Sequence, residues 1–329
     1  MYKKLDSVYS GPFCDVYRGE SETGAAVALK VVDLDFIRKP HDFRNEIKII
    51  KSLHHRNIAQ FLDTYALGED HYLVMPFYEK TLADVMKHFT KKRMKFNLEN
   101  PLNTEVASTS VFPLDSANAI VWGLADAVQY VHQQGIIHRD IKPSNVFFRS
   151  LEDLENPILG DFGISYNVMS PSLEEPLDQK FTDIATGYYK APELCFAVCD
   201  YGSEVDLWSL GILISCLYSR DGEPANRVAQ QNDNERAPEL NDFVLLQGTF
   251  EAFGTPTVAD KNSELYWPAL ADPWYHFVDF NFTKYDRKPT RELLPRCENA
   301  RITQLFEGLT RYDKREIISL DSDRGNRAE

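Results

Sequence analysis

The sequence predicts an α+β protein with two unequal lobes: a small β-rich N-terminal lobe and a larger, mainly helical C-terminal lobe. Residues 1–80 carry alternating and β-branched runs around one helical stripe, whereas helical periodicity dominates from Thr81 onward. The hydrophobic share of 43% and the charged share of 26% are ordinary for a globular chain. We therefore interpret residues 1–329 as one bilobal domain, with lobes at 1–76 and 77–329 and a ligand site in the cleft between them.

The elements of the small lobe follow from local patterns. Strands are predicted at residues 8–17 and 25–32, where apolar residues alternate or are β-branched and turn-forming residues lie between the two runs. Residues 43–53 place their apolar side chains on one face of a helix. Residues 59–67 and 71–77 are expected to form a second strand pair, joined by a Gly-Glu-Asp turn.

The large lobe is expected to be built around two long helices. Residues 116–134 have an amphipathic helical pattern that ends at Gly135. Residues 205–218 are apolar along nearly their whole length and too few to cross a bilayer, which predicts a buried core helix. The polar stretches 91–113 and 219–241 lack periodicity and are interpreted as insertions that form surface loops.

Composition excludes several classes of protein. The net charge of −14 and pI near 5.1 argue against a chain that binds nucleic acid or an acidic membrane surface. The five cysteines are odd in number and include no C-x-x-C pair, so a disulfide framework or a zinc knuckle is not expected. Reduced thiols, and an N-terminal segment without an apolar signal region, predict a location in the cytoplasm, the nucleus or both.

Four short motifs occur in a fixed order in the large lobe. They are H-R-D-I-K-P-S-N at 138–145, D-F-G at 161–163, A-P-E at 191–193, and D-x-W-S-x-G at 206–211. This order and spacing resemble the catalytic loop, the metal-binding loop and the activation segment of protein kinases. The resemblance implies the bilobal protein kinase fold and transfer of the γ-phosphate of ATP to a Ser or Thr hydroxyl.

The resemblance assigns a role to each polar residue of these motifs. Asp140 would accept the proton of the acceptor hydroxyl, and Lys142 would lie against the γ-phosphate. Asn145 and Asp161 would hold Mg²⁺, a cation that prefers oxygen ligands. Thr186, in the segment before A-P-E, is counted with the catalytic residues.

A lysine and a glutamate of the small lobe complete the phosphate site. The run V-A-L-K at 27–30 matches the strand motif V-A-I-K, so Lys30 is expected to reach the α- and β-phosphates. Glu46 lies in the helical stripe sixteen residues later and would hold Lys30 in place. The resemblance makes Met75 the gatekeeper and assigns adenine hydrogen bonds to the carbonyl of Pro76 and the N–H of Tyr78. Further nucleotide contacts are assigned to Val8, Gly11, Val16, Ala28 and Phe147.

The glycine-rich loop departs from the family pattern. The pattern G-x-G-x-x-G-x-V falls on residues 9–16, where Gly11 is the one glycine left and Tyr9 and Cys14 replace the others. Pro12 adds stiffness and has no N–H to donate. We predict a more rigid lid with weaker ATP binding, while a loop repaired by other contacts stays an open alternative.

Further runs narrow the resemblance. F-G-T-P at 253–256 with Trp267-Pro268 resembles the insert of cyclin-dependent and mitogen-activated kinases. Glu193 is then expected to pair with a late arginine, Arg315. Within that group, the lost loop glycines and the run from D-F-G-I-S-Y to A-P-E most resemble the fungal single-subunit kinase that activates cyclin-dependent kinases. This resemblance implies a monomer that phosphorylates the activation-loop threonine of a cyclin-dependent kinase, without a cyclin and without phosphorylation of its own loop.

The activation segment itself carries a related signal. Phe181 stands where cyclin-dependent kinases carry their activating threonine, and Thr182 lies one residue later. We hypothesise that packing of Phe181, or an acidic group near Arg139, takes the place of the phosphate. The acidic candidates are Glu174, Glu175 and Asp178.

Two other functions remain open at this point. One is a cyclin-dependent kinase relative that needs an activating subunit. The other is a pseudokinase scaffold, suggested by the altered glycine loop. Against the scaffold, every residue of the metal and phosphate machinery is present, from Lys30 and Glu46 to Asp140, Asn145 and Asp161.

Overall fold

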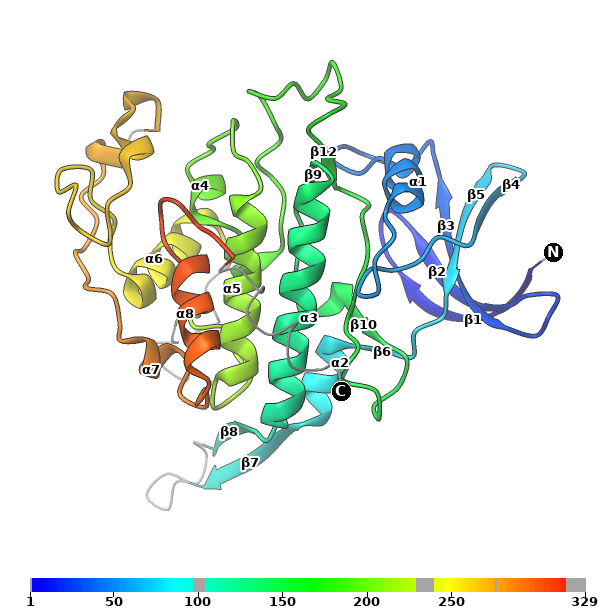
Figure 1. The fold of residues 1–329 in the computed structure, drawn as a ribbon, viewed down its shortest axis with the longest axis horizontal. Coiled ribbons are helices and arrows are strands. Elements are labelled where there is room, and N and C mark those ends of the chain that lie inside the picture. Colours follow the sequence, from blue (N-terminus) through cyan, green and yellow to red (C-terminus); the bar gives the residue numbers. More distant parts are fainter. Residues whose placement is uncertain (1, 97–103, 229–239, 276, 318–329) are drawn as a thin grey trace, which may run out of the picture.

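A computed structural model describes residues 2–96, 104–228, 240–275 and 277–317. Figure 1 shows two lobes side by side, a blue sheet with one helix and a larger body of green-to-red helices. The predicted bilobal α+β fold is therefore confirmed. No helix in these described ranges is long and apolar enough to cross a membrane.

The N-terminal lobe is a five-stranded antiparallel sheet with the strand order β1-β2-β3-β5-β4. One helix, α1, packs on it through Phe43 and Ile50, which share a buried cluster with Val32 and Leu73 of the sheet. The bounds are Lys3–Ser10 (β1), Asp15–Glu20 (β2), Ala26–Asp33 (β3), Phe43–Ser52 (α1), Asp63–Leu67 (β4) and Asp70–Pro76 (β5).

Helix α1 begins where the sequence supplies a cap. The Asp42 side chain accepts a hydrogen bond from the Asn45 N–H at 2.9 Å, and Glu46 lies in the first turn, where negative charge is favourable. The buried face of the helix carries Glu46 beside the apolar Ile49 and Ile50. The apolar stripe therefore carries a charged residue into the space between the lobes.

The C-terminal lobe has the long helices α3 and α5 side by side at its centre, with α8 against α5 (Figure 1). Its helices are Leu82–His88 (α2), Leu114–Gln133 (α3), Pro192–Cys195 (α4), Glu204–Tyr218 (α5), Asp242–Phe253 (α6), Thr290–Leu293 (α7) and Ala300–Leu309 (α8). Its 3₁₀ turns are Pro143–Asn145 (η1), Gly187–Tyr189 (η2), Pro268–Ala271 (η3), Pro273–Tyr275 (η4) and Phe277–Asp279 (η5). Every residue of α5 after Glu204 is buried, as expected for a helix that is apolar on all sides.

Short strands fix the loops that face the small lobe. They are Lys80–Thr81 (β6), Ile136–Ile137 (β9), Val146–Phe148 (β10), Ile158–Leu159 (β11) and Tyr166–Asn167 (β12). β10 pairs with β6 and β11, and β9 pairs with β12. The catalytic loop lies between β9 and β10, and D-F-G lies between β11 and β12. These two pairings therefore bring residues 138–145 and 161–163 to the same place.

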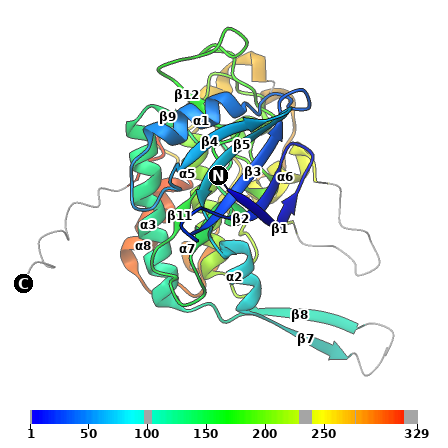
Figure 2. The same cartoon turned by 90° about the vertical axis from the view of Figure 1, so that its right-hand side faces the viewer.

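Two predictions about local structure need correction. The strand expected at 8–17 is broken, because β1 ends at Ser10 and the Gly11 N–H donates to the Cys14 carbonyl at 3.0 Å before β2 begins. The loop expected at 91–113 contains a hairpin of Thr90–Phe96 (β7) and Thr104–Ser110 (β8), which projects from the body in Figure 2. Within the second insertion, residues 229–239 lie outside the described residues.

Candidate active site

A lysine and two carboxylates meet at the cleft between the lobes. Lys30 Nζ lies 2.6 Å from Glu46 Oε1 and 2.9 Å from Asp161 Oδ1. Strand β3 carries Lys30, opposite Leu73 of the neighbouring strand β5, and α1 carries Glu46. The pair expected from the sixteen-residue spacing is therefore formed, and D-F-G supplies a second partner.

Burial and charge act against each other in this cluster. Burial by itself lowers the pKa of Lys30. The nearby Asp161 and Glu46 carboxylates raise it by a larger amount, so the net pKa lies above the ordinary value and the ammonium stays charged. Burial also raises the pKa of Asp161, yet Lys30 outweighs it and holds this pKa at about 2. Burial raises the pKa of Glu46. Because 43% of the Asp161 side chain is exposed, water screens its contact with Lys30 more than the Lys30–Glu46 contact.

Three polar side chains surround Asp140, two from the catalytic loop and one from the activation segment. Lys142 Nζ lies 2.8 Å from Asp140 Oδ2, and the Thr186 hydroxyl donates to Asp140 Oδ1 at 2.7 Å. Lys142 also donates to the Thr186 hydroxyl at 2.7 Å, and the Asn145 side-chain amide donates to Asp140 Oδ2 at 3.0 Å. A carboxylate held in this way can accept a proton from a hydroxyl placed beside it.

The loop backbone is held by a buried carboxylate of α5. Asp206 accepts hydrogen bonds from the N–H groups of His138 and Arg139, both at 2.7 Å. The His132 ring also lies 2.8 Å from Asp206. Arg139 has φ of +72°, a conformation that costs energy for a side-chain-bearing residue and needs such support.

The D-F-G segment is held in place by contacts with His138 of the catalytic loop. Phe162 is 1% exposed, and its ring lies 4.8 Å from the His138 ring. His138 Nε2 lies 3.0 Å from the Gly160 carbonyl. Asp161 has φ of +62° and reaches Lys30, so it faces the cleft while Phe162 faces the core.

The predicted adenine pocket has walls from both lobes. Ala28 pairs with Met75 across strands β3 and β5, which puts the predicted gatekeeper beside the expected adenine roof. The Tyr78 and Phe147 rings stack with centroids 5.9 Å apart. Val16, Pro76 and Gly11 are half-buried, whereas Val8 is 54% exposed.

The lid over the phosphate site is fastened by its own side chains. A Cβ on Gly11 would lie 2.4 Å from the Tyr9 hydroxyl oxygen, so the Tyr9 side chain depends on this glycine. Phe13 packs on His41, just before α1, with ring centroids 4.3 Å apart. Burial raises the pKa of the Cys14 thiol. The altered loop is therefore a closed turn with contacts of its own and to His41.

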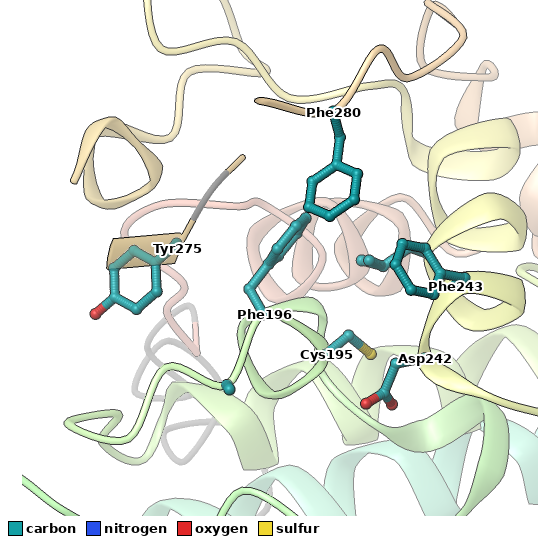
Figure 3. A pocket seen from close by; sticks show the side chains of 8 residues that line it. Cys195, Phe196, Asp242, Phe243, Tyr275 and Phe280 are labelled. Atoms are coloured by element: carbon teal, nitrogen blue, oxygen red, sulfur yellow. The ribbon is translucent and has the colours of Figure 1, made fainter. Parts of the chain in front are cut away.

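A separate pocket of about 470 Å³ lies in the C-terminal lobe. Figure 3 shows the side chains that line it. It is lined by Cys195, Phe196, Ala197, Asp242, Phe243, Leu246, Tyr275 and Phe280. Its one carboxylate, Asp242, is paired with Lys190 at 2.7 Å. This lining includes no residue of the Lys30 and Asp140 clusters and no cation to bind a phosphate, so we place the chemistry at those clusters.

Comparison with known proteins identifies the class. Residues 2–304 match the protein kinase domain, and the chain belongs to the protein kinase family. It is a Ser/Thr protein kinase of the cyclin-dependent kinase group, which confirms the predicted membership.

Two fungal kinases and one solved structure show the similarity in detail. The chain is 33% identical to serine/threonine-protein kinase CAK1 of Saccharomyces cerevisiae, over 74% of this chain and 71% of that protein. It is 28% identical to serine/threonine-protein kinase csk1 of Schizosaccharomyces pombe, over 93% and 87%. A chain of the yeast RNA Pol II CTD kinase CTDK-1 complex has the same fold, with a TM-score of 0.71, 22% identity, and coverage of 97% of this chain and 89% of that one.

A protein kinase domain uses ATP, and the oxygen donors here also fit magnesium. Asn145 uses its amide nitrogen for Asp140, which leaves the amide oxygen as a ligand, and Asp161 binds Lys30 through one of its two oxygens. Among the described residues no group of three or more His, Cys, Asp or Glu could hold a metal ion. Magnesium takes one or two protein ligands, here Asn145 and Asp161, and would complete its shell with phosphate oxygens and water. When bound, it neutralises charge on the phosphates.

Sequence analysis missed some supporting residues. The motif D-x-W-S-x-G was noticed, but Asp206 was given no role in holding the catalytic loop. His132 and the aromatic residues Tyr166 and Tyr201 were also not singled out. Asp206 lies 68 residues from His138 and 74 from His132, and Tyr201 lies 20 residues from Phe181, so the local sequence does not reveal these contacts.

Proposed function

We propose that this kinase phosphorylates the activation-loop threonine of a cyclin-dependent kinase and acts as a monomer without a cyclin. The similarity to CAK1 supports the assignment of the substrate. We further propose that its own activation segment needs no phosphate and that it works in the cytoplasm or nucleus.

The observation that supports activity without a cyclin is that contacts within the chain hold helix α1 against the cleft. The Lys30–Glu46 pair requires α1 to lie against the cleft. Contacts within the chain keep it there: the Asn45 side chain donates to the Ser165 carbonyl at 2.9 Å, and the Asp42 N–H donates to the Gly163 carbonyl at 3.0 Å. Helix α1 is thus tied to the glycine of D-F-G and to Ser165 just after it, a role that a second subunit would otherwise have to fill.

The proposed substrate is one folded loop rather than many Ser-Pro sites. Gly187 has φ of +54° and lies just before the A-P-E motif, where proline-directed relatives carry a larger residue. A backbone without a side chain here gives no pocket that selects proline after the acceptor. Recognition would then depend on contacts between folded domains.

A direct assay tests the substrate. The purified chain alone is incubated with Mg-ATP and a catalytically inactive cyclin-dependent kinase, and mass spectrometry locates the phosphate. We expect stoichiometric modification of the activation-loop threonine, and none with Asp140→Asn. Phosphorylation of a generic peptide but not of this substrate would overturn the substrate assignment and leave an active kinase.

One alternative has a specific motivation. A solved structure with the same fold is part of a complex, the yeast RNA Pol II CTD kinase CTDK-1 complex. A relative that needs an activating subunit would be weakly active alone and strongly stimulated by an added cyclin. Activity that is unchanged by cyclins, from a chain that sediments as a monomer, would exclude this alternative.

A further inference from the structure

Arg139 of the catalytic loop is buried next to a glutamate of the activation segment. Arg139 Nη2 lies 2.5 Å from Glu175 Oε1, and the two side chains are 1% and 10% exposed. A buried guanidinium cannot shed its proton, so it needs an anion to offset the cost of leaving water. Of the three acidic candidates in the sequence, Glu175 is the one that takes this place. Glu174 is 70% exposed and lies 3.7 Å from Lys39, and the Asp178 side chain is exposed.

Glu175 connects separate parts of the activation segment. Its Oε1 also accepts the N–H of Phe181 at 2.9 Å, and its backbone carbonyl accepts the Tyr166 hydroxyl at 3.0 Å. Tyr201 donates its hydroxyl to the Phe181 carbonyl at 2.6 Å. The carboxylate therefore fixes both Arg139 and the backbone at Phe181, the position of the activating threonine in cyclin-dependent kinases.

The surrounding groups form a built anion site. The Arg139 guanidinium lies over the Tyr166 ring at 4.5 Å and near the Tyr201 ring at 5.5 Å. A second cation, Lys180, is 5% exposed and lies 5.1 Å from the Tyr201 ring. Burial and the adjacent Arg139 lower the pKa of Lys180. Arg139 is thus the cation that pairs with Glu175, and Lys180, which donates to the Leu177 carbonyl, adds a second positive charge beside the same two aromatic rings.

The Glu175–Arg139 pair is connected to the catalytic Asp140 through a single peptide bond. Arg139 directly precedes Asp140, and its backbone is held by Asp206 in a strained conformation. The side chain of Arg139 is therefore the second anchor of the catalytic loop. Kinase activation loops are commonly ordered by pairing of an arginine with a phosphorylated residue. In this protein the Glu175 carboxylate of the same chain already forms an ion pair with Arg139.

We propose that Glu175 is a positioning residue for phosphoryl transfer, an internal anion that holds Arg139, and through it Asp140, in the arrangement needed for catalysis. It also holds the backbone at Phe181. The inference rests on kinase activity, which family membership shows, and on the proposed independence of the activation segment from phosphate, but not on the proposed protein substrate.

The test uses the full chain and a generic Ser/Thr peptide, so that it does not depend on the folded substrate. Glu175→Gln keeps the size and removes the charge. We expect kcat to fall about tenfold or more, with the KM for ATP changed less than about twofold. Glu174→Gln is the matched control, since it removes an adjacent exposed carboxylate, and it should keep the kcat of the wild type.

Two further measurements separate positioning from a structural role. Glu175→Asp should recover part of kcat, and acetate or inorganic phosphate added to Glu175→Ala should restore activity while leaving the wild type unaffected. In the double variant with Arg139→Met, Glu175→Gln should cause no further loss, because both residues act as one unit.

The proposal is overturned by any of three results. Glu175→Gln could match Glu174→Gln in kcat. Glu175→Gln could lower Tm while neither aspartate nor added anion restores activity to the Glu175 variants, which would make the role structural. The wild type could lose its activity on phosphatase treatment, which would show that a phosphate and not Glu175 holds the segment.

Discussion

At the scale of single residues, Asp206 shows how one buried carboxylate organises the catalytic loop. It is 1% exposed and accepts two backbone N–H bonds, from His138 and Arg139, as well as facing His132. Burial alone would raise its pKa, but the bond to His132 and the other donors lower it below the ordinary value. Asp206 is therefore ionised throughout the range in which a kinase operates.

We predict that Asp206→Asn destabilises the fold by about 3 kcal/mol at pH 7, because it removes the anion that satisfies two buried N–H groups. The depressed pKa implies that this stabilisation is complete above the unfolded-state pKa of about 3.9 and is lost as pH falls through the lower folded value. Urea unfolding at several pH values measures it. The gap between wild type and Asp206→Asn should narrow below about pH 4.

The exposed Asp115 of α3 provides the control. Asp115→Asn should change the free energy of unfolding by less than about 0.5 kcal/mol. A constant gap between wild type and Asp206→Asn down to pH 2 would contradict the assignment of a depressed pKa to Asp206.

At the scale of elements, the turn between β1 and β2 keeps one glycine, Gly11, of the three in the glycine-rich loop pattern. One of its N–H groups, that of Gly11, is already bonded to the Cys14 carbonyl. Phe13 packs on His41 and so fastens the lid to the start of α1. Donors used inside the turn cannot also bind phosphate oxygens, which gives the predicted weaker ATP binding a structural reason.

We predict that Cys14→Gly lowers the KM for ATP by roughly two- to fivefold, the range that corresponds to a glycine backbone effect of about 0.5–1 kcal/mol. The glycine would let the lid approach the phosphates more closely. Steady-state kinetics over a range of ATP concentrations measures this. Cys14→Ala is the control, because it removes the thiol but keeps Cβ. Equal KM values for the alanine and glycine variants would exclude a backbone origin.

At the scale of the whole molecule, Arg315 joins the last described segment to the activation segment. Its guanidinium pairs with Glu193 of the A-P-E motif, as predicted from the sequence, and the two side chains are 1% and 6% exposed. Its second nitrogen lies 3.0 Å from Glu193 Oε2, and it stacks over Trp208 at 4.9 Å. Arg315 thus joins the A-P-E motif, 122 residues earlier in the chain, to Trp208 of α5.

We predict that Arg315→Ala destabilises the fold by about 3–5 kcal/mol, the cost of leaving Glu193 buried without its partner. Thermal unfolding measures the change. Arg311→Ala is the matched control, since the Arg311 side chain is 53% exposed and reaches Glu316 only at 3.8 Å. An Arg315→Ala variant with the Tm of Arg311→Ala would show that this pair contributes little.

The motifs indicated which polar residues come together, because each has a role that the chemistry requires at a known spacing. The structure brings Lys30 to Glu46 and Asp161, and Asn145 to Asp140, while their contacts with ATP and metal are predictions. The sequence did not predict the β7–β8 hairpin, for a physical reason. The charged side chains of Lys91, Lys92 and Arg93 are exposed and point to both faces of β7, so this strand shows no alternation of polar and apolar residues.

What the sequence determined by itself is the class of enzyme and the identity of its polar machinery, since these depend on short motifs and on residue chemistry. The tertiary structure decided which anion faces Arg139. Glu174, Glu175 and Asp178 are equivalent by composition and nearly so by position. Only the path of the chain between Tyr166 and Phe181 buries Glu175 and leaves its neighbours in water. Burial, and with it the strength of a charge pair, is set by packing between distant segments, which no local pattern encodes.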